Sequence, residues 1–265
     1  MNRLRSALED DRAVYSAWLG THDPLLAAQV ARPQGAVRFG AVAFDMQHNM
    51  ATEHSVVQCM AAVAASGLPG AVRIPVGRFE QASKALDAGA HMVIAPMINS
   101  AADAEAFAGF AKFPPLGERS FGVGYAASLL GTDGAGYCRT ADRDTFAIAM
   151  IETVAALDAL DDILALPGID GVFCGPADLS ISIADRPEPT PFGASSIEAV
   201  REIAGKARGR GKLAATYVGS VEHARMAHEA GYRFMAYGNE AAYLRSGIEP
   251  FLRAAPRAAP QTATV

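Results

Sequence analysis

The chain has 265 residues and a formal net charge of −5, with 51% hydrophobic and 19% charged residues. This composition excludes an intrinsically disordered chain, and the negative charge disfavours a nucleic-acid-binding surface. No apolar run approaches the roughly 20 residues that span a bilayer, and the start, MNRLRSALEDDRA, carries acids where a signal peptide has an apolar core. We therefore expect a cytoplasmic protein with no membrane and no nucleic-acid partner.

Short apolar segments alternate with amphipathic ones along most of the chain. The amphipathic segments predict helices at 2–12, from Pro24, from Thr52 or Glu53 to Ala65, at 79–88, 101–112, around 156–164, and at 196–208, 221–230 and 239–253. The apolar segments predict eight strands, near residues 14–19, 41–45, 71–75, 92–96, 146–152, 171–174, 213–218 and 233–237.

Eight strands alternating with helices at this length predict a single α/β domain, a (β/α)8 TIM barrel over residues 1–253. A doubly wound open sheet is the alternative, but no G-x-G-x-x-G turn follows the first strands. The Gly-rich segment 113–144 interrupts the alternation and predicts a long, irregular but ordered loop. The Pro- and Ala-rich tail 254–265 lacks periodicity, and we expect it to be frayed.

The stretch 146–180 carries the clearest chemical signal. One apolar strand ends at Glu152, and the next runs into a GPAD loop that ends at Asp178. Parallel strands of a βαβ unit bring both acids to the same edge of the sheet, where two carboxylates suit Mg²⁺ or Mn²⁺. The alternative is that these acids cap helices or pair with an arginine; Asp178 in particular could cap the turn that follows it.

Three more polar residues follow predicted strands at this edge. Arg73 interrupts an apolar strand, and such a guanidinium suits a carboxylate or enolate oxygen. A salt bridge across the barrel, to Asp45 or Asp87, is the alternative role. His48 follows Asp45 closely enough for that carboxylate to orient the imidazole or tune it for proton transfer. A Schiff-base mechanism is disfavoured, because no lysine ends a predicted strand.

Five motifs in order carry a family resemblance: FDMQH, VRIP, LDAGAHMVIAPM, FPPLGERSFG and IETVAALDALDDILALPGIDGVFCGPADLS. Together they resemble the HpcH/HpaI aldolases, the metal-dependent class II pyruvate aldolases, over roughly residues 40–240. The resemblance implies a TIM barrel of the phosphoenolpyruvate/pyruvate type. It also implies a carbon–carbon lyase that forms or cleaves 4-hydroxy-2-oxo acids from pyruvate or hydroxypyruvate and an aldehyde.

The resemblance also implies roles for individual residues. Glu152 and Asp178 match the family's ligands of a divalent metal, with Mg²⁺ or Mn²⁺ expected and Co²⁺ as a further candidate. Arg73 matches the arginine that contacts the keto or enolate oxygen, and His48 matches the histidine of proton transfer. Asp45 and Asp87 match acids that hold the His and Arg network.

The loop after the sixth strand matches the part of the family site that receives the substrate carboxylate. Backbone amides of Gly175 and Ala177 would bind it, whereas Pro176 has no N–H to give. Gln47 stands where many relatives carry Glu, whereas members that accept hydroxypyruvate more often read DMQH, as this chain does. The resemblance therefore implies substrate contact for Gln47 rather than acid–base chemistry. The loop beginning at 122–124 departs from relatives, which leaves the aldehyde open. The resemblance further implies a homohexamer, a trimer of dimers, that exchanges the helix 239–253.

Two other function classes remain open at this point. A CoA-ester lyase of the citrate lyase β type would share the barrel and the acid pair, but it needs basic residues for nucleotide phosphates. Arg139 and Arg143 are candidates, although no basic cluster lies near the predicted rim. A non-catalytic barrel that serves binding or assembly is the other class.

Overall fold

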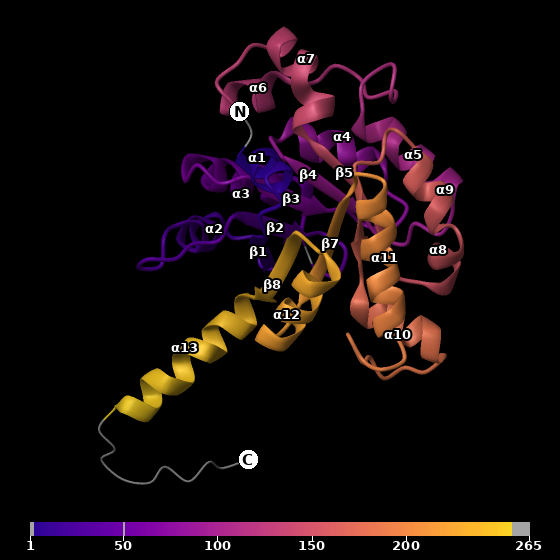
Figure 1. Ribbon diagram of the computed structural model, residues 1–265. Helices are drawn as coiled ribbons and strands as arrows, with labels where there is room; N and C mark the ends of the chain where they lie inside the picture. The colour runs from indigo at the N-terminus through magenta and orange to yellow at the C-terminus, as the bar shows by residue number, and fades with distance from the viewer. Residues whose placement is uncertain (1–2, 50, 256–265) are drawn as a thin grey trace.

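The computed structural model describes residues 3–49 and 51–255. Eight parallel strands close into a barrel, with β8 hydrogen-bonded back to β1, so the open-sheet alternative is wrong and the TIM barrel is confirmed (Figure 1). The strands are β1 (Val14–Leu19), β2 (Ala41–Asp45), β3 (Gly70–Arg73), β4 (Met92–Ala95), β5 (Phe146–Ile151), β6 (Gly171–Cys174), β7 (Leu213–Val218) and β8 (Phe234–Asn239).

Helices connect the strands and cover the barrel. They are α1 (Arg3–Glu9), α2 (Pro24–Ala31), α3 (Glu53–Ala65), α4 (Glu80–Asp87), α5 (Ala101–Ala111), α6 (Gly124–Leu129), α7 (Gly134–Asp144), α8 (Val154–Asp158), α9 (Leu160–Ala165), α10 (Pro176–Ala184), α11 (Ile197–Gly209), α12 (Val221–Ala230) and α13 (Glu240–Ala254). Within the described ranges, no helix is both long and apolar enough to cross a membrane.

Side-chain caps set where several helices begin. Asp23 accepts a hydrogen bond from the amide of Leu26 at 2.8 Å and is followed by Pro24, the pattern that predicted this helix start. Thr52 and Ser55 form a reciprocal capping box at α3. Ser100 caps α5 by accepting from the backbone amide of Asp103.

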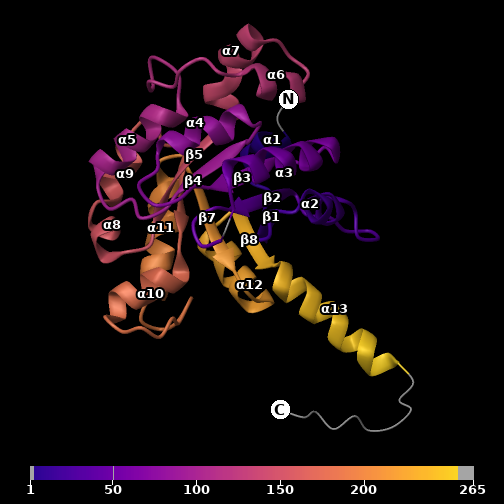
Figure 2. The ribbon, with the colours of Figure 1, turned by 180° about the vertical axis from the view of Figure 1, so that it is seen from behind.

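The predicted irregular loop at 113–144 is wrong in part, because it contains α6 and α7. Figure 2 shows these two helices beyond α4, at the end of the molecule far from α13. They share a small core of their own, formed by Val123, Ala126, Ala127, Tyr137 and Ala141. This packing outweighs the low helix propensity of the glycines, which made the segment read as a loop.

The prediction of a loop after β6 is also wrong, because the helix α10 begins directly at Pro176. The helical stretch before β6 is divided into α8 and α9 at Ala159. The predicted tail lies outside the described residues from 256 onward.

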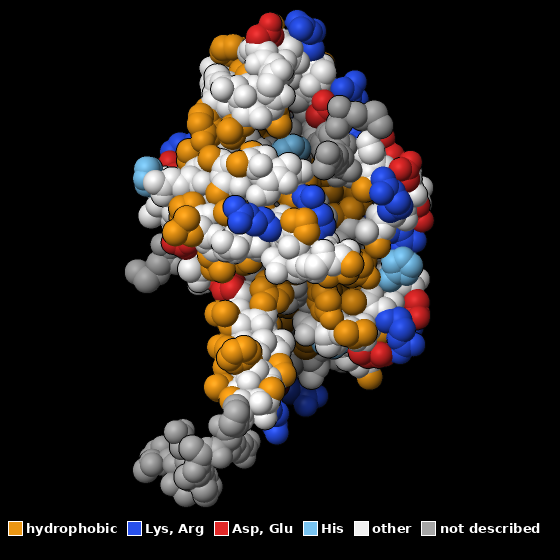
Figure 3. Space-filling model, turned by 90° about the vertical axis from the view of Figure 1, so that its left-hand side faces the viewer, with side chains coloured by type: hydrophobic (Ala, Val, Ile, Leu, Met, Phe, Trp, Pro, Cys, Tyr) orange, Lys and Arg blue, Asp and Glu red, His pale blue; other side chains and the backbone are white. Residues whose placement is uncertain are grey.

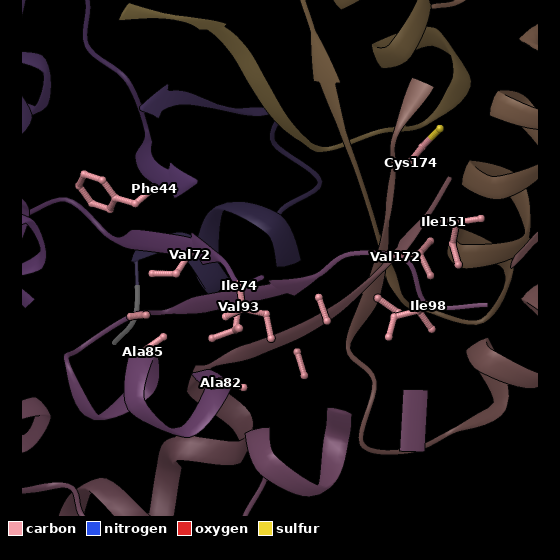
Figure 4. Close-up of a cluster of buried hydrophobic side chains, with 14 of the residues drawn as sticks. Phe44, Val72, Ile74, Ala82, Ala85, Val93, Ile98, Ile151, Val172 and Cys174 are labelled. Atoms are coloured by element: carbon pink, nitrogen blue, oxygen red, sulfur yellow. The ribbon is translucent and has the colours of Figure 1, made fainter. Parts of the chain in front are cut away.

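Successive residues of each strand face two different cores, and this alternation positions the functional rim. Figure 4 shows outward-facing side chains such as Val72 and Val172, which pack against the helices. Their neighbours Ala71 and Phe173 point into the barrel, where Leu4 of α1 joins the same cluster. Residues two positions apart share a face. The inward face of β3 therefore continues from Ala71 to Arg73 at the carboxyl end.

Candidate active site

Three charged residues continue the inward faces of their strands at the carboxyl rim. Ala43 of β2 faces inward and is followed two residues later by Asp45, as Ala71 is by Arg73. Met150 of β5 also faces inward, and Glu152 follows it by two. The parallel register pairs Asp45 with Arg73 at the same height. All three side chains therefore meet where the barrel opens.

Arg73 and Asp45 form a bidentate ion pair inside the rim. Arg73 Nε donates to Asp45 Oδ1 at 2.8 Å, and Nη2 donates to Oδ2 at 2.7 Å. The side chains are only 8% and 3% exposed. Among the described residues, the only hydrogen-bond partner of the remaining Nη1 is the Met150 sulfur, at 3.9 Å. One face of the guanidinium lies 4.8 Å from the ring centroid of Trp18. The fork is thus fixed while one nitrogen stays available for a substrate oxygen.

The pair matches the salt-bridge alternative for Arg73, with Asp45 and not Asp87 as partner. The two roles are compatible, because Asp45 uses only two of the three guanidinium nitrogens. Burial alone would raise the pKa of Asp45, but hydrogen bonds and charge from Arg73 outweigh burial and hold that pKa below its ordinary value. Asp45 therefore stays ionised, and Arg73 keeps its orientation.

Two further groups complete the hydrogen bonding of Asp45. The backbone amide of Gln47 donates to Oδ1 at 3.0 Å, and the side-chain Nδ2 of Asn49 donates to Oδ2 at 3.0 Å. Asn49 in turn packs on Gly20, where an added Cβ would lie only 2.6 Å from the Asn49 amide oxygen. Glu240 holds that loop by accepting from the amides of Gly20 at 3.0 Å and Thr21 at 2.6 Å. The sequence reading missed Asn49, Gly20 and Glu240.

Gly20→Ala tests this support for Asp45. The new methyl group cannot fit without moving the side-chain amide of Asn49, so we expect a several-fold loss of kcat/KM with a nearly unchanged Tm. Gly205→Ala is the matched control, because nothing lies within 4 Å of its Cβ position and it sits inside a helix. Equal activity of the two variants would contradict a role for this packing.

Glu152 is a buried carboxylate with one fixed oxygen. The residue is 2% exposed, and its Oε1 accepts a hydrogen bond from the Met97 amide at 2.8 Å. A Cβ on Gly175 would lie 2.8 Å from Oε2, so only glycine lets the β6 end approach this closely. Burial raises the pKa of Glu152 to about 7; the Met97 amide opposes the shift, and the negative charge of Asp178 adds to it.

Asp178 lies in the first turn of α10, next to Glu152. Gly175 is the N-cap residue, and no side chain makes the cap hydrogen bond, so the capping alternative for Asp178 is not what the structure shows. Asp178 is exposed, whereas Glu152 is buried, and the two carboxyl groups are close enough to hydrogen-bond when one is protonated. Two like charges in one place favour either a shared proton or a bound cation.

The donor set fits a hard divalent cation held by few protein ligands. Within residues 3–49 and 51–255, no group of three or more His, Cys, Asp or Glu residues forms a metal site. Mg²⁺ commonly uses one or two carboxylates and fills its remaining positions with water and substrate oxygens. The free oxygen of Glu152, the exposed carboxylate of Asp178 and the opening at Gly175 agree with that arrangement.

The other predicted site residues fall into two groups. His48 is exposed in the loop after β2, close enough for its charge to lower the pKa of Asp45. Gln47 is half-buried, and its buried Oε1 has no hydrogen-bond partner in the described part of the chain. Gly175 and Ala177 lie at the α10 start. All four therefore belong to the rim.

Asp87 does not join them within one chain. It ends α4, and its carboxylate pairs with Arg119 at 2.6 Å instead of with Arg73 or His48. Arg119 is buried and contacts the Tyr137 hydroxyl as well. Trp18, in contrast, contacts Arg73 at the site but was not predicted from the sequence. It is the only tryptophan of the chain and stands near the end of a strand.

The chain is similar to known proteins of one family. The HpcH/HpaI aldolase/citrate lyase family matches residues 16–246. A hydroxypyruvate/pyruvate aldolase from Rhizorhabdus wittichii (strain RW1) is 33% identical over 244 residues, which cover 92% of this chain and 94% of that protein. A 4-hydroxy-2-oxovalerate aldolase from Novosphingobium aromaticivorans is 31% identical over 258 residues, covering 96% and 94%.

A solved structure gives the same result at the level of the fold. A HpcH/HpaI aldolase/citrate lyase family protein from Burkholderia cenocepacia J2315 matches with a TM-score of 0.82 and 27% identity, over 96% of this chain and 98% of that one. The match extends over nearly the whole barrel. The chain belongs to the HpcH/HpaI aldolase/citrate lyase family.

Proposed function

We propose that the protein is a divalent-metal-dependent carbon–carbon lyase that cleaves or forms 4-hydroxy-2-oxo acids. Pyruvate or hydroxypyruvate is the 2-oxo acid, and an aldehyde is the second partner. The observation that carries this proposal is the Arg73 fork, which Asp45 fixes while Nη1 has no carboxylate partner among the described residues. The charge of Arg73 acts on Glu152, which lies next to Asp178. The names of the relatives from Rhizorhabdus and Novosphingobium support the same reaction class.

The protein's own groups perform binding, orientation and proton transfer. Arg73 Nη1 binds the keto oxygen, whose negative charge grows in the enolate. The amides at the α10 start bind the substrate carboxylate, because a helix N-terminus favours anions. His48, exposed at the rim, exchanges the proton at C3 through water. Mg²⁺ or Mn²⁺ held by Glu152 and Asp178 supplies Lewis-acid polarisation of the keto oxygen when bound.

In the cleavage direction, the 4-hydroxyl proton passes to water at the rim beside His48, and the C3–C4 bond breaks. The electron pair of that bond passes into the 2-oxo acid part as an enolate, and the aldehyde departs. The enolate then takes a proton at C3 and becomes pyruvate or hydroxypyruvate. Arg73 is held in place before the charge develops, so little reorganisation accompanies the step.

Exchange of the C3 protons of pyruvate tests the proposal without an aldehyde. Asp178→Asn should slow metal-dependent deuterium exchange, followed by NMR, by about 100-fold or more, because it removes one ligand charge. Asp185→Asn is the control, since this acid lies just past the other end of the same helix. Exchange that persists in metal-stripped protein would contradict the proposal.

The structure places Arg143, one of the two basic candidates of the CoA-ester lyase alternative, away from the rim. Arg143 lies just before β5, at the amino end of the barrel, and pairs with Asp144 at 2.9 Å. It therefore points to the face opposite the acids. Cleavage of a malyl- or citramalyl-CoA faster than of any 4-hydroxy-2-oxo acid would favour that alternative.

We also propose that α13 packs on a second copy of the chain in a homo-oligomer. This helix leaves the end of β8 and projects from the barrel, and none of its residues is buried (Figure 1). Figure 3 shows hydrophobic side chains gathered along it. Phe251 is 80% exposed and Leu252 62%. With α2, the helix borders an open groove of about 810 Å³. Such an apolar face marks an interaction surface.

Phe251→Glu should shift the protein to a smaller species in size-exclusion chromatography with light scattering. The substitution places a charge in the apolar contact, where burial is costly. Val221→Glu is the control, because Val221 is equally exposed, at 75%, but begins α12. An unchanged mass for Phe251→Glu, together with unchanged mass for the control, would argue against this interface.

A further inference from the structure

A second cavity lies at the amino-terminal face of the barrel, opposite the acids of the rim. Its volume is about 540 Å³. The starts of four consecutive strands surround it: Phe146 begins β5, and Asp170, Lys212 and Arg233 directly precede β6, β7 and β8. Side chains of α1 and the end of α11 close its sides. This volume is in the range of small-molecule sites.

Positive charge predominates in this cavity, although the chain as a whole is negative. Five basic side chains line it against three acidic ones, on a chain with a formal net charge of −5. The basic lining residues are Arg5, Arg208, Arg210, Lys212 and Arg233. A concave surface with charge of one sign concentrates ions of the other sign.

Two of the three acids of the cavity already have partners at hydrogen-bond distance, and the third, Glu9, is mostly exposed and lies 3.8 Å from Arg5. Asp170 accepts from the buried Lys112 ammonium at 2.6 Å and from the Ala147 amide at 2.7 Å. Asp11 is shared, since both Arg208, at 2.8 Å, and Arg233, at 2.9 Å, pair with its one carboxylate. Two guanidinium groups on one carboxylate leave a positive charge that these ion pairs do not balance.

Arg5 and Lys212 have the least compensated charges. The guanidinium of Arg5 lies 4.2 Å from the ring centroid of Phe146, and its nearest carboxylates, Glu9 and Asp170, are 3.8 and 3.9 Å away. These separations exceed hydrogen-bond length, and the buried Nε has no hydrogen-bond partner within the described residues. Lys212 donates to the backbone oxygens of Leu166 and Ile169 and not to a carboxylate.

A purely structural ion-pair network would also place basic residues at the base of a barrel. A buried charged donor without a partner is costly in such a network. Nε of Arg119 also lacks a partner among the described residues, but that guanidinium holds Asp87 at 2.6 Å, whereas Arg5 has no carboxylate closer than 3.8 Å. The orphan Nε of Arg5 beside the unbalanced pair on Asp11 therefore indicates a missing anion. A multiply charged anion could accept from Arg5, Lys212 and Arg208 together.

We propose that this cavity binds a small anion with at least two negative charges, either a phosphoryl compound or a polycarboxylate. The site is separate from the rim and does not depend on the lyase proposal. Its ligand would connect α1 to the end of α11 and the start of β7, so binding should stabilise the folded chain. Inorganic pyrophosphate and citrate represent the two sources of such charge, and inorganic phosphate tests the minimum size.

Isothermal titration of the metal-free, full-length protein with each of the three anions measures the site directly. We expect saturable binding, with affinity that falls as NaCl is raised. Arg5→Gln should weaken it by about tenfold or more. Arg210→Gln is a second cavity variant, since Arg210 is partly exposed and its loss is less of a threat to folding. Thermal-shift measurements report whether each variant remains folded.

Two controls separate this site from other anion binding. Arg225→Gln removes the same charge from an exposed ion pair on α12 and should leave the affinity unchanged. Arg73→Gln removes the rim guanidinium and should also leave it unchanged. The proposal is overturned if no anion binds saturably below about 10 mM, a weak-binding limit. It is also overturned if Arg225→Gln weakens binding as much as Arg5→Gln does, or if only Arg73→Gln abolishes it.

Discussion

Asp45→Ala should lower the free energy of unfolding by about 3–5 kcal/mol and remove most of the lyase activity. The substitution leaves the Arg73 guanidinium buried without its carboxylate, and an unpaired buried charge carries a large desolvation cost. It also frees the guanidinium to rotate, because two of its nitrogens lose their acceptors. Catalysis that depends on a fixed donor is then lost together with stability.

Urea unfolding and the rate of aldol cleavage measure the two effects. Glu222→Ala is the control, because its ion pair with Arg225 has similar length, 2.6 Å, but both side chains are exposed. We expect no measurable change of stability or activity for the control. If Asp45→Ala unfolded at the same urea concentration as the parent protein, the buried pair would not be a major source of stability.

Glu152→Gln should stabilise the metal-free protein at pH 8 while abolishing metal-dependent activity. The pKa of Glu152 is about 7 in the folded state, against an ordinary value of 4.5, so the folded state holds the proton more tightly than the unfolded chain. Stability therefore falls as pH rises from about 4.5 to 7, by about 3 kcal/mol in total. Glutamine keeps the acceptor for the Met97 amide but never ionises, so the variant avoids this loss.

Unfolding curves in EDTA at pH 5 and pH 8 test the sign. The parent protein should be less stable at pH 8 than the variant, and the two should be nearly equal at pH 5. Mn²⁺ should raise the stability of the parent at pH 8 and leave the variant unchanged, because cation binding requires the ionised carboxylate. If the variant had the same stability as the parent at both pH values, ionisation of Glu152 would not be the cause of the loss of stability at high pH.

The strand ends were predictable from sequence because short apolar runs followed by polar residues mark them directly. Asp45, Arg73 and Glu152 were found in this way, and the barrel then placed them on one rim. The hydrogen bonds that support them were not predictable. Glu240 lies 220 residues from Gly20, and no local pattern relates them until β8 closes on β1.

Local composition misled the reading wherever packing outweighs propensity. Glycines made 113–144 read as a loop, although Tyr137 and its alanine neighbours provide a core for two helices. The expected role of Asp87 depended on family position alone. In the structure its partner is Arg119, from the segment read as a loop, and only the folded chain brings these two together.

The alternating faces of the strands have a consequence for how this protein can change in evolution. An insertion of a single residue within β3, before Arg73, would turn the guanidinium outward into the helix layer and leave an apolar side chain at the rim. Insertions after the strand ends do not turn any strand residue to the other face of the sheet. The segments that follow the strands, such as residues 96–100 after β4, can therefore lengthen and shorten while the charged rim is inherited intact.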